Sequence, residues 1–226
     1  MEQKARIGRY SGYSGGNGSA LIEATAKEDV ECMKILIAAG ANLDAKDEWP
    51  WRRPIHIAAE KENYTLMDLL LDNGADIDAI HNGGNALETA TQVDRIDVAK
   101  YLIGRGANVG ADIQSSNILM SVIWWYYNKP QTYVSDTFKL IVETDKTVLE
   151  KRGWNGYTPY LYACYTGNQA VVDYLVEKGS NTEAKTTDGK TCSVLCREKL
   201  ANGKFDGCIA ITGEILNVLF IKILYH

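Results

Sequence analysis

The sequence has few of the residues that build metal or catalytic centres. Its three histidines are His56, His81 and His226, and none has a second His or Cys at a spacing that would hold a metal ion. The five cysteines include no C-x-x-C pair and are odd in number, which favours reduced thiols over a disulfide framework. Cys192 and Cys196 are expected to be small buried packing residues. The sequence therefore predicts no metal, no cofactor and no catalytic residue.

Long apolar runs and an excess of positive charge are also absent. No stretch reaches about eighteen uninterrupted apolar residues, and residues 1–6 do not lead into the apolar core of a signal peptide. We therefore expect a cytoplasmic protein that does not insert into membranes. Lysine and arginine number 24 against 29 aspartates and glutamates, a net charge of -5, so nucleic acid is not an expected partner. Residues 8–18 are rich in glycine but lack the Gly-Lys-Ser/Thr of a phosphate loop, which predicts a flexible tail over residues 1–18.

A repeated block is what the sequence does contain. Six positions open the block at intervals of 34, 32, 32, 41 and 33 residues: Leu21, Ile55, Leu87, Leu119, Tyr160 and Ser193. A second marker closes it at Gly40-Ala41, Gly74-Ala75, Gly106-Ala107 and Gly179-Ser180. The predicted units are 19–46, 47–80, 81–112, 113–150, 151–185 and 186–226, and the fourth has lost its glycine. Such a unit cannot bury its apolar face alone, so copies must stack into a solenoid.

Each unit is typical of two short antiparallel helices. The first begins at a Thr-Pro or its substitute, because proline is tolerated in the first helical turn. The second carries an apolar run such as Leu69-Leu70-Leu71 or Tyr174-Leu175-Val176. A glycine then ends this helix, because glycine takes a positive φ without a Cβ penalty.

The blocks resemble those of the ankyrin-repeat family. Arg53-Pro54-Ile55-His56-Ile57-Ala58-Ala59 and Thr158-Pro159-Tyr160-Leu161-Tyr162-Ala163 are similar to its Thr-Pro-Leu-His-x-Ala motif, and Gly40-Ala41-Asn42-Leu43-Asp44-Ala45-Lys46 to its Gly-Ala-Asp-Val-Asn-Ala-Lys tail. The resemblance covers about residues 19–203 and implies an all-α solenoid of about six helix pairs with short β-hairpin fingers. It also implies that His56 ties its turn together by hydrogen bonds. Residues 117–157 fit least well, because Asn117-Ile118 stands where Thr-Pro is usual.

The aromatic residues indicate a binding face. The chain has five Trp and thirteen Tyr but only three Phe, a bias that suits interfaces better than dry cores. The resemblance implies that partners contact the fingers and the two residues after the alanines of each first helix, a pair that includes Gln92-Val93 in the third unit. The candidate partner-binding residues on these positions are Trp49, Trp51, Arg52, Trp124, Trp125, Tyr126, Tyr127, Trp154, Asn155, Tyr157 and Tyr165.

Two structural alternatives apply to these aromatics. Trp124 and Trp125 could pack inward and fill volume in the irregular unit. Adjacent helical residues are roughly 100° apart, however, so both cannot face the core squarely. Trp49 and Trp51, which flank Pro50, could instead pack on each other within their finger.

The C-terminal segment is apolar nearly all round over residues 215–224, whereas terminal repeats normally present a polar outer face. It is too short to span a membrane. We expect a helix or strand tucked against the sixth unit, or else a homodimer contact or docking segment.

These features together predict a non-enzymatic protein-binding module, acting as an adaptor, scaffold or inhibitor through its aromatic concave face and fingers. One alternative is a small-ligand protein or enzyme that uses the Tyr/Trp-rich groove as a pocket. Another is a membrane-surface protein docked by its apolar C-terminus.

Overall fold

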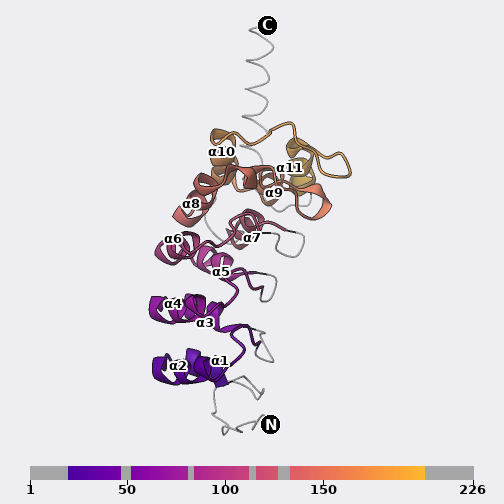
Figure 1. The fold of residues 1–226 in the computed structure, drawn as a ribbon. Coiled ribbons are helices and arrows are strands. Elements are labelled where there is room, and N and C mark those ends of the chain that lie inside the picture. The colour runs from indigo at the N-terminus through magenta and orange to yellow at the C-terminus, as the bar shows by residue number, and fades with distance from the viewer. Residues whose placement is uncertain (1–19, 47–51, 81–83, 112–115, 127–132, 202–226) are drawn as a thin grey trace, which may run out of the picture.

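The computed structural model describes residues 20–46, 52–80, 84–111, 116–126 and 133–201, and within them the chain is a stack of helix pairs (Figure 1). The predicted tail and the apolar C-terminal segment lie outside the described residues. The helices are α1 (Ala20–Ala26), α2 (Val30–Ala38), α3 (Pro54–Glu60), α4 (Tyr64–Asp72), α5 (Ala86–Gln92), α6 (Ile96–Gly104), α7 (Ile118–Trp125), α8 (Asp136–Thr144), the 3-10 turns η2 (Lys146–Leu149) and η3 (Trp154–Gly156), α9 (Pro159–Thr166), α10 (Gln169–Glu177) and α11 (Cys192–Ala201).

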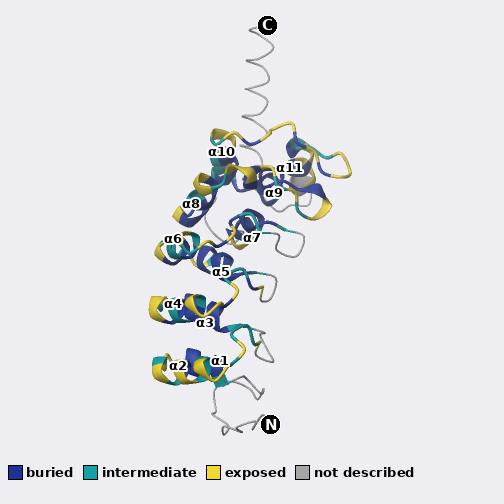
Figure 2. Ribbon diagram, in the orientation of Figure 1, coloured by how far each residue is buried: buried dark blue, intermediate teal, exposed yellow. Residues whose placement is uncertain are grey.

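The predicted repeat register is confirmed by the first helix of each unit. The aligned residues Leu21, Ile55, Leu87, Leu119 and Tyr160 are all buried and each is the second residue of its helix. Ser193, which is small and half-buried, holds the same place in α11. Odd-numbered helices form an inner column and even-numbered helices α2 to α10 an outer one with exposed outer faces (Figure 2). The core is therefore one continuous seam between the two columns.

Short polar caps begin most of these helices. Asn63 and Asn168 accept hydrogen bonds from the amides of Leu66 at 3.1 Å and Val171 at 3.2 Å, which starts α4 and α10. In the irregular unit Asn117 accepts from the Met120 amide at 3.0 Å. The asparagine that replaces Thr-Pro thus caps α7 as well as a threonine would.

Glycine ends four of the second helices as predicted. Gly40, Gly74, Gly106 and Gly179 have φ between +79° and +97°, a region that L side chains rarely adopt. The fourth unit has no glycine there. Asp145 instead takes an extended conformation after α8 and accepts the Thr147 amide at 2.8 Å to start η2. The longer spacing of this unit follows from that added turn and from a longer connection between α7 and α8.

Carboxylates join successive units at the base of the fingers. Asp44 accepts from the backbone amide of Asp76 at 3.2 Å, and Asp78 from that of Asn108 at 3.0 Å. Glu150 does the same for Asn181 at 2.7 Å. These contacts recur one unit apart, so the stack is tied by hydrogen bonds as well as by apolar packing.

The fingers contain no β-strand within the residues that the structure describes, although Gly84 and Ser116 are isolated bridge residues. The finger before α9 closes through a hydrogen bond from the Gly153 amide to the Tyr157 carbonyl, at 2.9 Å. The next finger docks on it, because the Thr187 amide donates to the Asn155 carbonyl at 3.0 Å. Fingers therefore also pair across units.

The expectation of reduced thiols is wrong for two of the five cysteines. Cys164 of α9 and Cys192 of α11 are joined in a disulfide. Both are buried, and so is Cys196, which agrees with the expected packing role. The pairing was not visible in the sequence because it depends on how the inner helices of neighbouring units face each other.

Candidate functional site

An apolar strip lies where two inner helices end. Trp124 and Trp125, the last residues of α7, are 58% and 55% exposed, and Val93, which directly follows α5, is 58% exposed. Helices α5 and α7 pack against each other, so the three side chains belong to neighbouring units. The alternative that the tryptophans pack inward is contradicted by their exposure. Large exposed apolar side chains from adjacent units are typical of an interaction surface.

The structure shows why α7 ends this way. Five of the first six residues of the helix are buried and hold it in place: Ile118, Leu119, Met120, Val122 and Ile123. The two tryptophans follow in the last turn. Their exposure is therefore set by a well-anchored helix rather than by a loop.

Tyr126 requires a correction, because it lies in the core and offers no surface to a partner. Its hydroxyl donates to the Ser135 hydroxyl and accepts from the Ser135 amide at 3.2 Å. Its ring lies 5.3 Å from that of Tyr133 and 6.1 Å from that of Phe138, centroid to centroid. Burial raises the pKa of the Tyr126 phenol. The residue links α7 to the start of α8.

A second aromatic cluster joins the finger before α9 to α9 itself. Trp154 is 41% exposed, and its ring lies 4.9 Å from Tyr157 and 5.8 Å from Tyr162. Tyr165 stacks on Tyr162 at 6.0 Å and is half-buried. Tyr157 is buried, so it supports Trp154 rather than meeting a partner, which corrects its predicted role. Burial raises the pKa of Tyr162 to about 12.

Asn155, also a predicted contact residue, is exposed at the tip of this finger. It has a positive φ of 53°, and its carbonyl accepts hydrogen bonds from both the amide and the hydroxyl of Thr187. Its backbone thus holds two fingers together while its side chain faces solvent.

Four predicted contact residues remain: Trp49, Trp51, Tyr127 and Arg52. Trp49, Trp51 and Tyr127 lie outside the described residues. Arg52 is half-buried and pairs with Glu60 of α3 at 3.4 Å. Its charge is already matched within the chain.

Ion pairs cover the ends of the earlier inner helices. Lys27 pairs with Glu23 at 3.0 Å, Lys61 with Glu28 at 3.1 Å, and Arg95 with Glu62 at 3.0 Å. The apolar strip follows directly along the stack. A protein bound to the strip would therefore contact paired opposite charges beside the exposed indole rings. It would not face a surface that carries charge of a single sign.

Two residues of interest were not among the sequence candidates. Val93 occupies one of the two positions that follow the alanines of the first helix in each unit, and its exposure makes it part of the strip. That position in the repeat was the feature of the sequence that could have identified it. Glu88 stands at the motif position that His56 occupies one unit earlier and is buried. Burial raises the pKa of Glu88, and hydrogen bonds from Ser121 and Gln92 lower it by less.

The described part of the chain contains neither a cluster of metal-ligating side chains nor a helix that could span a membrane. There, no three His, Cys, Asp or Glu side chains gather as a metal site would require. None of the helices in the same residues combines the length and the apolar character needed to cross a bilayer.

Family models match most of the stack. A model of three ankyrin repeats matches residues 16–116, and a single ankyrin-repeat model matches residues 155–187. The chain belongs to the ankyrin-repeat family. The two matches leave the irregular unit between them, which agrees with its altered cap and helix end.

Curated relatives share parts of this ankyrin array. The chain is 34% identical over 98 residues to the nuclear factor NF-kappa-B p105 subunit of Gallus gallus, covering 42% of this chain and 10% of that protein. It is 31% identical over 86 residues to protein phosphatase 1 regulatory subunit 27 of Mus musculus, covering 38% and 55%. It is 25% identical over 197 residues to palmitoyltransferase AKR1 of Lachancea kluyveri, covering 84% and 26%. The chain thus spans about half or less of the length of these relatives.

Solved structures of other proteins have the same fold. One chain in the complex of the Bd0816 predatory endopeptidase from Bdellovibrio bacteriovorus with the immunity protein Bd3460 superposes with a TM-score of 0.62 at 26% identity, covering 87% of this chain and 98% of that one. The ankyrin-repeat protein EF0377 gives 0.61 at 22% identity, covering 80% and 91%.

Proposed function

We propose that this ankyrin array is a non-enzymatic protein-binding module whose contact surface is the strip of Val93, Trp124 and Trp125, extended by Trp154 on the neighbouring finger. The observation that carries the proposal is the exposure of two adjacent tryptophans on an anchored helix. Tryptophan is enriched among the residues that dominate binding energy, each worth about 2 kcal/mol or more at an interface centre. Exposing two of them to water without a partner costs solubility.

A rigid array suits this role. The tryptophans end a helix whose other apolar residues are buried, and Trp154 rests on Tyr157 and Tyr162. Little side-chain freedom is lost when such a surface is covered, so more of the contact energy appears as affinity. The partner is a protein, and the module acts as an adaptor, scaffold or inhibitor.

The names of similar proteins support a protein-binding role in general. Two relatives are named as a nuclear factor subunit and a protein phosphatase regulatory subunit, and one similar chain comes from a complex of an endopeptidase with an immunity protein. The similarity to a palmitoyltransferase extends over 26% of that enzyme and supplies no argument for transferase chemistry here. A cytoplasmic location and a homodimer contact through residues 215–224 stay predictions.

Comparative affinity capture tests the proposal. The full chain, a Trp124→Ala/Trp125→Ala variant and an Ile35→Ala control are used as baits in one lysate, and the captured proteins are quantified by mass spectrometry. Ile35 is 70% exposed on the outer helix α2. We expect one set of proteins to be lost with the tryptophan variant and kept with the control. Equal capture by all three folded baits would refute the proposed surface.

A further inference from the structure

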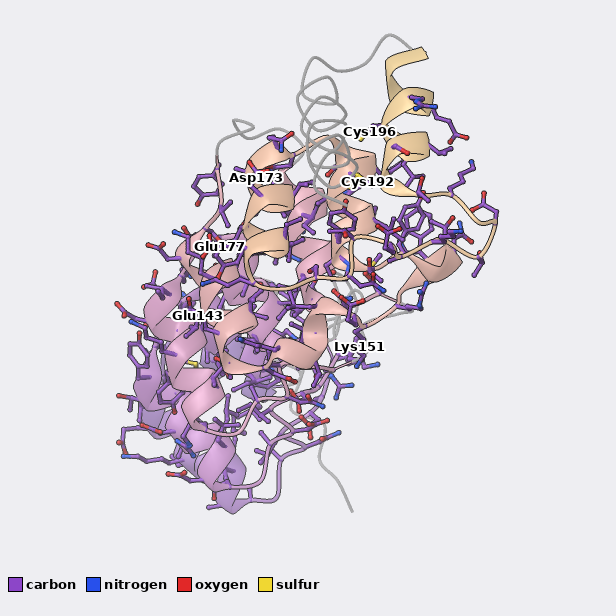
Figure 3. All side chains as sticks on the ribbon, turned by 90° about the horizontal axis from the view of Figure 1, so that it is seen from above. Glu143, Lys151, Asp173, Glu177, Cys192 and Cys196 are labelled. Carbon is purple, nitrogen blue, oxygen red and sulfur yellow. A yellow bond between two sulfur atoms is a disulfide. The ribbon has the colours of Figure 1, made fainter. Side chains whose placement is uncertain are left out.

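Three cysteines meet where the last described helix packs on the array. Cys164 of α9 and Cys192, the first residue of α11, form a disulfide with a Cα–Cα distance of 5.4 Å across 28 residues of sequence. Cys196 lies one turn further along α11, and its Sγ donates to the Cys164 carbonyl oxygen at 3.4 Å. Figure 3 shows Cys192 and Cys196 together on α11. All three residues are buried.

This arrangement places a thiol beside a disulfide. The Cys196 sulfur contacts the backbone carbonyl of Cys164, the residue whose own sulfur is in the disulfide. Cys192 and Cys196 are four residues apart, so they share one face of α11. Both can therefore reach Cys164 from the same helix.

We propose that Cys164, Cys192 and Cys196 form a thiol–disulfide exchange site that fastens α11 to α9 and responds to small thiols and disulfides. In the internal step, the Cys196 thiolate attacks the Cys164 sulfur. The bond between Cys164 and Cys192 breaks as the bond to Cys196 forms, and Cys192 leaves as a thiolate. That thiolate takes up the proton that Cys196 gave to solvent, so no oxidant is consumed.

An excess of small thiol opens the site completely. Two small thiols are oxidised to their disulfide, and Cys164 and Cys192 each become a thiol. In a reducing compartment a disulfide is typically transient and redox-sensing, whereas in an oxidising one it persists as a structural bond. The same three residues would form a redox-responsive contact in a reducing compartment and a structural bond in an oxidising one.

Helix α11 is suited to report this chemistry. Among the described elements its main packing partner is α9, and Cys192, Leu195 and Cys196 form its buried face. Within the described residues α11 packs mainly on one helix, and a helix with few packing neighbours opens at a lower free energy than a central one. Opening admits the small thiol to the buried sulfurs, and loss of the bond then favours the open form.

Disulfide mapping of the full chain tests the site without any partner, so its outcome is separate from that of the proposed binding surface. Wild type, Cys192→Ser and the control Cys32→Ser are equilibrated with reduced and oxidised glutathione, alkylated and mapped by mass spectrometry. Cys32 lies on α2 at the other end of the stack. We expect wild type and Cys32→Ser to contain the Cys164–Cys192 bond and Cys192→Ser to form Cys164–Cys196. A folded Cys192→Ser chain that keeps both cysteines as thiols in oxidised glutathione would overturn the proposal.

Two further measurements keep the test decisive. If Cys192→Ser does not fold, the Cys164–Cys196 bond is sought as a minor form of wild type, and its absence overturns the exchange step. Hydrogen exchange is also measured on oxidised and reduced wild type. Reduction should speed exchange of the α11 amides by at least about tenfold and leave α3 and α4 unchanged. Equal protection of α11 in both states would show that the bond does not fasten the helix.

Discussion

Asp94 accepts hydrogen bonds from both the backbone amide and the hydroxyl of Thr137, which lies 43 residues later, at 3.1 and 2.9 Å. The Tyr133 hydroxyl adds a third bond at 2.8 Å. Burial acts to raise the pKa of the Asp94 carboxyl, but these hydrogen bonds outweigh it and the pKa is lowered. One side chain in the turn after α5 thereby holds the irregular unit on the regular one.

The same turn position is strained in three successive units. Glu28, Glu62 and Asp94 have φ between 54° and 58°, a left-handed conformation that costs about 1–2 kcal/mol for a residue with a side chain. Each carboxylate reaches the following unit: Glu28 contacts Asn63, Glu62 pairs with Arg95, and Asp94 contacts Thr137. The corresponding position before α10 is Gly167, with a φ of 79°.

Replacing Glu62 and replacing Asp94 by glycine should change the free energy of unfolding in opposite directions. Glu62→Gly loses an exposed ion pair worth less than about 1 kcal/mol and relieves strain, so we expect a gain of about 0.5 kcal/mol in unfolding free energy. Asp94→Gly relieves similar strain but loses three hydrogen bonds to a charged group, and we expect a loss of about 2 kcal/mol. Urea titrations of both variants provide the comparison. A change of the same sign in both would mean that the turn carboxylates do not differ in this way.

Glu88→Gln should raise stability at neutral pH and have no such effect in acid. Burial raises the folded-state pKa of Glu88 above its ordinary 4.5. Its contribution to stability is therefore fully present below pH 4.5 and is lost as the pH rises through the raised folded pKa. Glutamine removes this loss and keeps a polar group near Gln92. Urea midpoints from pH 4 to 7 should diverge with increasing pH, and parallel curves would contradict the assignment.

Trp125 and Tyr126 are neighbours with separate roles. Tyr126→Phe leaves the Ser135 amide without its partner and removes one hydrogen bond of the Ser135 hydroxyl, which keeps Thr137 and the Phe138 amide. We therefore expect a loss of about 1–3 kcal/mol in stability with partner capture retained. Trp125→Ala removes an exposed side chain and should change stability by no more than about 0.5 kcal/mol. Thermal unfolding followed by circular dichroism measures both. Equal destabilisation would show that Trp125 packs in the core.

The repeat register could be predicted from sequence because it depends on local patterns. The prediction correctly placed the second residue of the first helix in each unit. It also correctly placed the glycines that end four of the second helices, Gly40, Gly74, Gly106 and Gly179. Apolar spacing and positive φ are properties of single segments, so they can be read without knowing what lies next to them.

The features that were missed depend on contacts between segments that are separated in the sequence. Tyr126 turns inward because Ser135 and Phe138, beyond the longer connection, provide partners for it. Cys164 meets Cys192 because α9 packs on α11. Tyr157 is covered by Trp154 and Tyr165. A motif gives the position of each residue in its own segment but not which side chain from another segment will cover it.

The most direct measurement is the affinity of a purified captured partner for three chains: wild type, Trp124→Ala/Trp125→Ala, and Ile35→Ala. Calorimetric titration should give a dissociation constant at least about 30-fold higher for the tryptophan variant and an unchanged one for the control. An unchanged dissociation constant for a folded tryptophan variant would contradict the proposed surface.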